Sequence, residues 1–168
     1  MATAANLLAS LGVDEWEVRV YSALSTASSL AAAIKNRTNA VHLAYSFYKI
    51  NKSLTEMISQ AYEMVEGKRT PPPDDEPITP QRLHLVSYNL DELARMIVHL
   101  YERSKSAGLT NNSLMAGSLN GMLKHVEEIK DVADWFEAAA DSERLSAISA
   151  RAKQEKENGD LFDLSQVD

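Results

Sequence analysis

Histidines and carboxylates are the residues of this chain whose types and spacing could support metal or acid–base chemistry. A helical bundle that binds two metal ions usually supplies Glu-x-x-His pairs from facing helices, because residues three apart share one helical face. That order is absent from the sequence, and the reverse order occurs twice, at His99 with Glu102 and at His125 with Glu128. Because neither pair has a third ligand nearby, we interpret both as surface pairs and expect no bound metal, no cofactor and no catalytic residue.

Acidic residues also gather at helical spacing in two other places. The carboxylates concerned are Glu127, Glu128, Asp131 and Asp134 late in the chain, and Glu63 with Glu66 in its first half. Aligned acids repel one another by a few tenths of a kcal/mol each, a cost that a helix can tolerate in order to hold Mg²⁺. A solvated acidic face is the favoured interpretation. Whether the later cluster binds a metal stays open at this point.

Two of these arrangements resemble site motifs of known helical families. The two acidic groups resemble the paired motifs of helical nucleotide pyrophosphatases, which hold Mg²⁺ between neighbouring helices, although more than sixty residues separate the groups here. Arg37-x-x-x-x-His42 is similar in spacing to the helical nucleotide-binding and ribonuclease domains of toxin systems. These resemblances imply an enzymatic alternative, either a Mg²⁺-dependent nucleotide hydrolase that uses helix carboxylates or a ribonuclease-like domain.

Composition and charge weigh against several classes of protein. The chain has 168 residues, no cysteine and a formal net charge of −7. The lack of cysteine excludes disulfides, thiolate metal sites and cysteine nucleophiles. Lys and Arg are spread along the chain rather than clustered, so we expect no nucleic-acid partner. No apolar run approaches the ~20 residues that span a bilayer, and no leader-like order of charges precedes Arg19, so we expect a cytoplasmic protein without a membrane partner.

Four apolar stripes at alternating three- and four-residue spacing predict the elements that must position these side chains. The stripes are Trp16, Val20, Ala23, Ala27, Leu30 and Ile34; Leu43, Phe47, Ile50, Leu54, Met57, Ala61 and Met64; Leu83, Val86, Leu90, Leu93, Ile97 and Leu100; and Leu119, Met122, Val126, Ile129, Ala133, Phe136 and Ala140. Each stripe marks one amphipathic helix with one buried face. We therefore predict an all-α fold, an up-down antiparallel four-helix bundle.

The phase of the second stripe indicates a break between the first two helices. It is displaced from the first stripe by two residues, about 200° of rotation, so one continuous helix would aim its apolar halves in opposite directions. We place the break at residues 35–39. The alternative, a single helix over residues 14–66, would be about 80 Å long.

Residue types at the helix ends predict where each helix begins and stops. Asp14 and Glu17 form a capping box, and Val13 is placed to pack on Val18. Thr79 and Pro80 predict the start of the third helix and Gly108 its end, while Thr110 predicts the start of the fourth, with Leu109 placed to pack on Leu114. Short additional helices are expected at both termini, around Leu7, Leu8 and Leu11, and from Asp141 or Ser142 onward.

The chain is expected to form one domain over residues 1–157. A proline-rich connector occupies residues 67–80, and residues 158–168 form an acidic-hydrophobic tail. Both divisions follow from composition alone.

Six residues are candidates for an interaction surface. Gly117 and Gly121 each cost a helix interior about 1 kcal/mol, so close approach of another backbone is a reason to place them there. The others are Tyr45, Tyr48, Leu161 and Phe162. Together with the apolar filling of the stripes, they favour a non-enzymatic interaction or assembly protein that binds itself as a homo-oligomer or another protein. A small-ligand-binding bundle is the remaining alternative.

Overall fold

The computed structural model describes residues 12–35, 43–68 and 78–157, with side chains described as far as Ser142 and with the exception of that of Leu114. Its helices are α2 (Val13–Ala33), α4 (Ala44–Val65), α5 (Pro80–Ser106), the short 3₁₀ helix η1 (Leu109–Asn111), α6 (Ser113–Lys124) and α7 (Val126–Glu157). These described ranges contain helices and no strand, so the predicted all-α class is confirmed.

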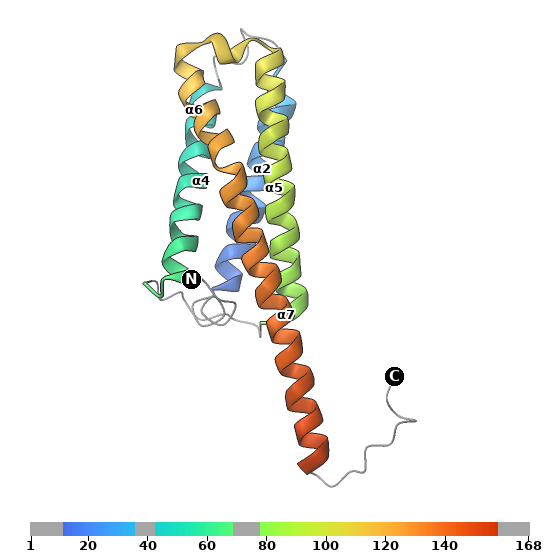
Figure 1. Ribbon diagram of the computed structural model, residues 1–168. Coiled ribbons are helices and arrows are strands. Elements are labelled where there is room, and N and C mark those ends of the chain that lie inside the picture. Colours follow the sequence, from blue (N-terminus) through green and yellow to red (C-terminus); the bar gives the residue numbers. More distant parts are fainter. Residues whose placement is uncertain (1–11, 36–42, 69–77, 158–168) are drawn as a thin grey trace.

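The helices lie alongside one another and alternate in direction (Figure 1). The colour progression shows α2 and α5 running one way while α4, α6 and α7 run the other. α5 has the most extensive packing, against α7 on one side and α2 on the other, and α4 packs chiefly on α6. α5 is thus the element against which most of the other helices are placed.

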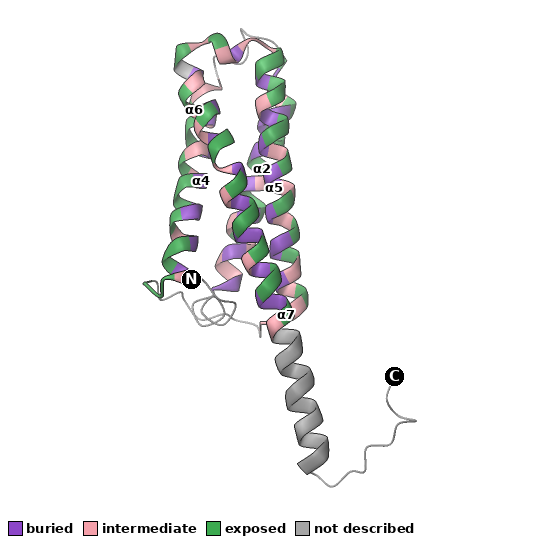
Figure 2. Ribbon diagram, in the orientation of Figure 1, coloured by how far each residue is buried: buried purple, intermediate pink, exposed green. Residues whose placement is uncertain are grey.

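The predicted apolar stripes form the core. Every residue of the four stripes is buried except Leu43, which is half-buried and packs against the same core. Buried positions alternate with exposed ones along each helix, as the burial colours show (Figure 2). Where the first turn of α2 meets the last turn of α4, the Trp16 ring lies 5.4 Å from that of Phe136, and the Trp16 indole N–H donates to the sulfur of Met64 at 2.8 Å. This hydrogen bond satisfies the polar tip of a fully buried tryptophan.

The described parts of residues 14–66 form two separate helices rather than one, as predicted. α2 ends at Ala33 and α4 begins at Ala44. The Thr79 hydroxyl accepts a hydrogen bond from the backbone N–H of Arg82, with Pro80 in the first helical turn, so the predicted start of α5 is also confirmed. Gly108 has a φ of 81°, in the left-handed region that glycine tolerates best, directly after α5.

The predicted capping box at the start of α2 is wrong. Gly12 is the N-cap of this helix, and no side chain of the described residues caps it. Asp14 and Glu17 instead bind the Arg82 guanidinium of α5. The predicted packing of Val13 on Val18 is also wrong, because Val13 is buried and Val18 is 70% exposed on the outer face. The Arg82 guanidinium thus binds two carboxylates that the sequence pattern assigned to backbone N–H groups of α2 itself.

The predicted fourth helix is two helices. It begins at Ser113 rather than after Thr110, which lies within η1, and it is interrupted at His125 between α6 and α7. There the His125 N–H donates to the carbonyl of Met122, three residues back instead of four. The His125 imidazole also lies 3.1 Å from the Thr55 hydroxyl of α4. The apolar stripe keeps its buried face across the break.

The separate last helix predicted from Asp141 or Ser142 is also wrong. α7 continues through both residues to Glu157, so the two segments form one helix. Neither residue type stops a helix by itself, and both are tolerated within one when their side chains face outward. The short N-terminal helix around Leu7, Leu8 and Leu11, most of the connector and the 158–168 tail lie outside the described residues.

Candidate functional site

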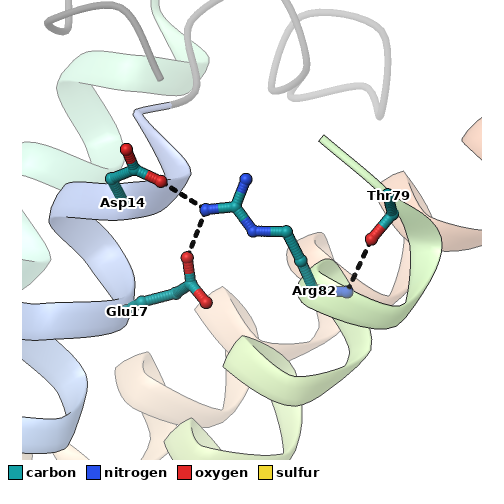
Figure 3. A network of polar contacts seen from close by, with 4 residues as sticks. All are labelled: Asp14, Glu17, Thr79 and Arg82. Atoms are coloured by element: carbon teal, nitrogen blue, oxygen red, sulfur yellow. Dashed lines mark hydrogen bonds and ion pairs between the residues drawn. The ribbon is translucent and has the colours of Figure 1, made fainter. Parts of the chain in front are cut away.

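One arginine of α5 fastens the first turn of α2. The Arg82 guanidinium binds Asp14 and Glu17 through the same terminal nitrogen, while its backbone N–H is held by Thr79 (Figure 3). The hydrogen bond to Glu17 is the largest cause, and that to Asp14 a further one, by which the pKa of Arg82 is raised above its ordinary value, although partial burial opposes it. Because the guanidinium stays protonated at every practical pH, the cross-helix pairing depends on the two carboxylates.

A second arginine of α5 fastens the other end of α2. Arg103 donates from Nε to the carbonyl of Ala31 and from a terminal nitrogen to that of Ile34, each at 2.6 Å. The last carbonyls of a helix have no partner within it and carry the negative end of the helix dipole. The Arg103 guanidinium supplies hydrogen-bond donors to these carbonyls and a positive charge at the negative end of the dipole. Arg82 and Arg103, which are 21 positions apart on α5, therefore hold α2 at both of its ends.

A groove of about 540 Å³ runs between α2 and α5 in the span between these two arginines. Its lining residues are Glu17, Val18, Tyr21, Ser22, Ser25 and Thr26 of α2, and Leu85, Val86 and Asn89 of α5. The short side chains of Ser22, Ser25 and Thr26 leave the space unfilled above Val86. The groove forms because α2 presents small residues toward α5, while Arg82 and Arg103 hold both ends of α2 against α5.

Large apolar side chains stand exposed along this groove. Val18 is 70% exposed, Tyr21 68% and Leu85 53%, and Tyr88 stands exposed less than one turn further along α5. Single exposed apolar residues are ordinary on a protein surface, but several on two adjacent helices form a patch of the kind that marks an interaction site. We call Val18, Tyr21, Leu85 and Tyr88 together with the groove the α2/α5 face. Sequence analysis missed this face because these side chains lie outside the stripes.

The tyrosines predicted from sequence lie on a different surface. Tyr45 and Tyr48 are both exposed near the start of α4, and their rings stack with centroids 6.4 Å apart. The Lys49 ammonium lies 5.5 Å from the centre of the Tyr45 ring, within the range of a cation–π contact. Leu161 and Phe162 lie outside the described residues.

The two candidate glycines have different surroundings. A Cβ added at Gly121 would stand 2.8 Å from both amide atoms of Asn51 on α4, so this glycine admits a neighbouring helix of the same chain. The Asn51 Oδ1 atom is buried there and has no hydrogen-bond partner among the described residues. A Cβ at Gly117 would meet no atom of the described residues within 4 Å. Gly117 is the exposed member of the pair, and Gly121 serves packing between α4 and α6.

The acidic residues named from sequence do not gather into a metal centre within the described residues. Several pair with nearby side chains instead: Glu66 with the Lys68 ammonium at 2.9 Å, Glu127 with the Lys130 ammonium at 3.6 Å, and Glu128 with the His125 imidazole at 3.1 Å. The hydrogen bond that the Lys68 ammonium donates to Glu66 raises the pKa of Lys68. Arg37 and His42 lie outside the described residues.

A different group of three potential ligands comes together between α5 and α7. His84 Nδ1 lies 2.7 Å from a carboxylate oxygen of Glu137, and one ligand atom from each of His84, Glu137 and Asp141 lies within 4.8 Å of the others. Sequence analysis missed this cluster because His84 is 53 positions from Glu137. The only local signal is the spacing of four between Glu137 and Asp141, which puts both carboxylates on one face of α7.

Comparison of the chain with models of protein families, with curated proteins and with solved structures gives no match. In the described part of the chain, no helix combines the length and the apolar character needed to cross a membrane.

Proposed function

We propose that this chain is a non-enzymatic interaction protein, an up-down four-helix bundle that associates with a second copy of itself through the α2/α5 face. The observation that carries the proposal is the groove of about 540 Å³ flanked by the exposed Val18, Tyr21 and Leu85 side chains. Burial of an apolar face of this kind against a partner is favourable, because it removes apolar surface from water. The arginine contacts at both ends of α2 support a face that is already formed before association.

The interior supports packing rather than chemistry as the role of the buried residues. Buried positions among the described residues carry aliphatic, aromatic and methionine side chains, with Ser87 and Ser104 as the polar exceptions. Both serine hydroxyls donate to backbone carbonyls, of Ala133 and Leu100 respectively. A bundle that performs catalysis inside its core places convergent polar groups there.

A second copy suits the α2/α5 face because α2 combines one large ring with small residues along the same surface. Beyond Tyr21, the exposed positions of α2 all carry small side chains: Ser22, Ser25, Thr26, Ser28, Ser29 and Ala32. When two copies of α2 meet antiparallel about a twofold axis, the large side chains of one copy oppose the small ones of the other. Tyr21 then has a place beside the serines of its partner, and the dipoles of the two helices are opposed.

The size of the face is comparable with that of a specific interface. α2 has 21 residues. At 1.5 Å per residue and about 10 Å between neighbouring helices, a face two helices wide covers roughly 600 Å² in projection. Stable interfaces bury about 800 Å² on each partner, so a dimer through this face needs α5 as well as α2.

The test is the mass of the particle, measured by light scattering behind size exclusion over a concentration series. We expect twice 18.6 kDa at high concentration and dissociation on dilution. Tyr21→Glu should shift the particle to the monomer, because a carboxylate would be buried at the centre of the interface. Tyr45→Glu is the matched control, since Tyr45 is 70% exposed against 68% for Tyr21 but lies on α4. It should leave the dimer intact.

Three results would overturn the proposal. A monomer of the unmodified chain at every concentration rules out self-association and leaves the groove to a different protein or a small ligand. A dimer that Tyr45→Glu disrupts and Tyr21→Glu does not would move the interface to α4. A dimer that both variants disrupt equally would show that added charge, not the α2/α5 face, controls association. Far-UV circular dichroism of each variant checks that its helices remain folded.

A further inference from the structure

His84, Glu137 and Asp141 form a cross-helix cluster that is separate from the α2/α5 face. His84 comes from the first turns of α5, and the two carboxylates come from successive turns of α7. The His84 ring lies 2.7 Å from Glu137, and the ligand atoms of all three residues lie within 4.8 Å of one another. His84 is half-buried and both acids are exposed, so the cluster opens to solvent.

The two helices are held in fixed register beside this cluster. Ser87, one turn after His84 on α5, donates from its buried hydroxyl to the carbonyl of Ala133, one turn before Glu137 on α7, at 2.8 Å. α5 and α7 also have the most extensive packing in the described part of the chain. A ligand set built on two rigid, packed helices keeps its geometry better than one carried by loops.

The two carboxylates of the cluster have like charges on one face of α7. Glu137 and Asp141 are four residues apart, a spacing at which two negative charges repel. The imidazole of His84 is hydrogen bonded to one of these two acids, Glu137. A divalent cation between the three groups would neutralise both acids at once and still accept the imidazole nitrogen as a ligand.

We propose that His84, Glu137 and Asp141 form a binding site for a divalent transition-metal ion of the Zn²⁺ type. One imidazole nitrogen with two carboxylate oxygens suits Zn²⁺, whereas Mg²⁺ and Ca²⁺ prefer oxygen ligands throughout. Three protein ligands leave a fourth tetrahedral position for water on the exposed side.

The geometry of the cluster requires only small movements to accept this ion. Bonds of about 2.0–2.2 Å to a tetrahedral Zn²⁺ put neighbouring ligand atoms roughly 3.3–3.5 Å apart. The 2.7 Å between His84 and Glu137 must therefore lengthen by about 0.6–0.8 Å as the metal replaces the hydrogen bond between them. Asp141, whose ligand atom lies within 4.8 Å of the other two, closes in by rotation of an exposed side chain.

The test is a titration of the full chain, freed of metal with a chelator, with Zn²⁺ and separately with Co²⁺. We expect one Zn²⁺ per chain by calorimetry and a rise in melting temperature. The visible absorption of bound Co²⁺ should be that of a tetrahedral nitrogen and oxygen site. Asp141→Asn is the decisive variant, because it keeps the hydrogen bond between His84 and Glu137 and weakens only the third ligand. It should lower the affinity at least tenfold, and His84→Gln should lower it further.

His125→Gln is the matched control. His125 also contacts a carboxylate, Glu128 at 3.1 Å, but lies in no group of three ligands among the described residues. This variant should bind Zn²⁺ as the unmodified chain does. Equal affinity in Asp141→Asn and the unmodified chain would overturn the three-ligand site, as would equal loss in His84→Gln and His125→Gln. Failure of the unmodified chain to bind would overturn it as well. None of these results depends on whether the chain forms a dimer.

Discussion

Replacement of Arg103 by methionine should destabilise the protein by removing the contact that holds the end of α2. The substitution keeps most of the aliphatic stem and removes the two hydrogen bonds to the carbonyls of Ala31 and Ile34, both 2.6 Å long. Ala31 and Ile34 are buried, with 3% and 2% of their surface exposed. Their carbonyls would lose charged donors at the negative end of the helix dipole.

The size of the effect follows from the two hydrogen bonds. A hydrogen bond to a charged group contributes about 1.5–3 kcal/mol, and a polar group left without a partner in a buried place costs a similar amount. Both bonds come from one guanidinium at the edge of the fold, where water can replace part of what is lost, so their contributions do not add fully. We expect the free energy of unfolding to fall by about 2–3 kcal/mol, which lowers the urea midpoint by roughly 1–2 M.

The assay is urea unfolding followed by far-UV circular dichroism and by tryptophan fluorescence. Arg95→Met is the matched control on the same helix, since the Arg95 side chain is 66% exposed and pairs with Glu92 in the preceding turn. Exposed pairs of this spacing contribute about 0.3–0.5 kcal/mol, so this control should change little. Arg103→Lys, which retains the charge and loses the fork of donors, should fall between them.

Equal losses of stability in Arg103→Met and Arg95→Met would refute this reasoning. The loss would then follow from removing an arginine from α5 and not from breaking the contacts of Arg103 with α2. Hydrogen exchange locates the effect. Amides in the last turn of α2 should exchange faster in Arg103→Met, while those in the first turn, beside Arg82, should be protected as before.

Four further predictions rest on the packing and the net charge. Gly117→Ala should raise the free energy of unfolding by about 0.5–1 kcal/mol, because helix propensity improves and nothing lies within 4 Å. Gly121→Ala should lower it by about 1 kcal/mol, since the new methyl group meets Asn51 at 2.8 Å, and Asn51→Ala in the same chain should restore the gain seen at Gly117. Ser87→Ala should cost about 0.5–1.5 kcal/mol through loss of its bond to Ala133, measured like the others by urea unfolding. Because each copy carries a formal charge of −7, raising NaCl from about 50 to 500 mM should strengthen the dimer in sedimentation experiments.

The sequence predicted the helices well because the evidence for them is local. Apolar residues repeat with the helical period, so Trp16, Leu54, Leu90 and Phe136 could be assigned to the core from their spacing alone, and all are buried. The change of phase before Leu43 likewise predicted separate helices on either side of residues 35–39. Thr79 and Gly108 predicted the limits of α5, because helix ends depend on a few neighbouring residues.

The errors at helix ends arose where a residue distant in the sequence contacts side chains near the helix end. Asp14 and Glu17 match a capping box in type and spacing, yet Arg82, from 65 positions beyond Glu17, binds both. The interruption at His125 carries no Pro or Gly at that position, and it coincides with a contact to Thr55 on α4. No local pattern contains either partner.

What the sequence determined by itself was the set of helices and the buried face of each. Only the tertiary structure decided which outward residues meet across them: the two arginines that fasten α2 to α5, the exposed face between those helices, and the His84, Glu137 and Asp141 cluster. The physical reason is that an apolar stripe fixes which side of a helix faces inward. The rotation and axial shift between two packed helices, which bring particular outward side chains together, depend on how the side chains of both interdigitate.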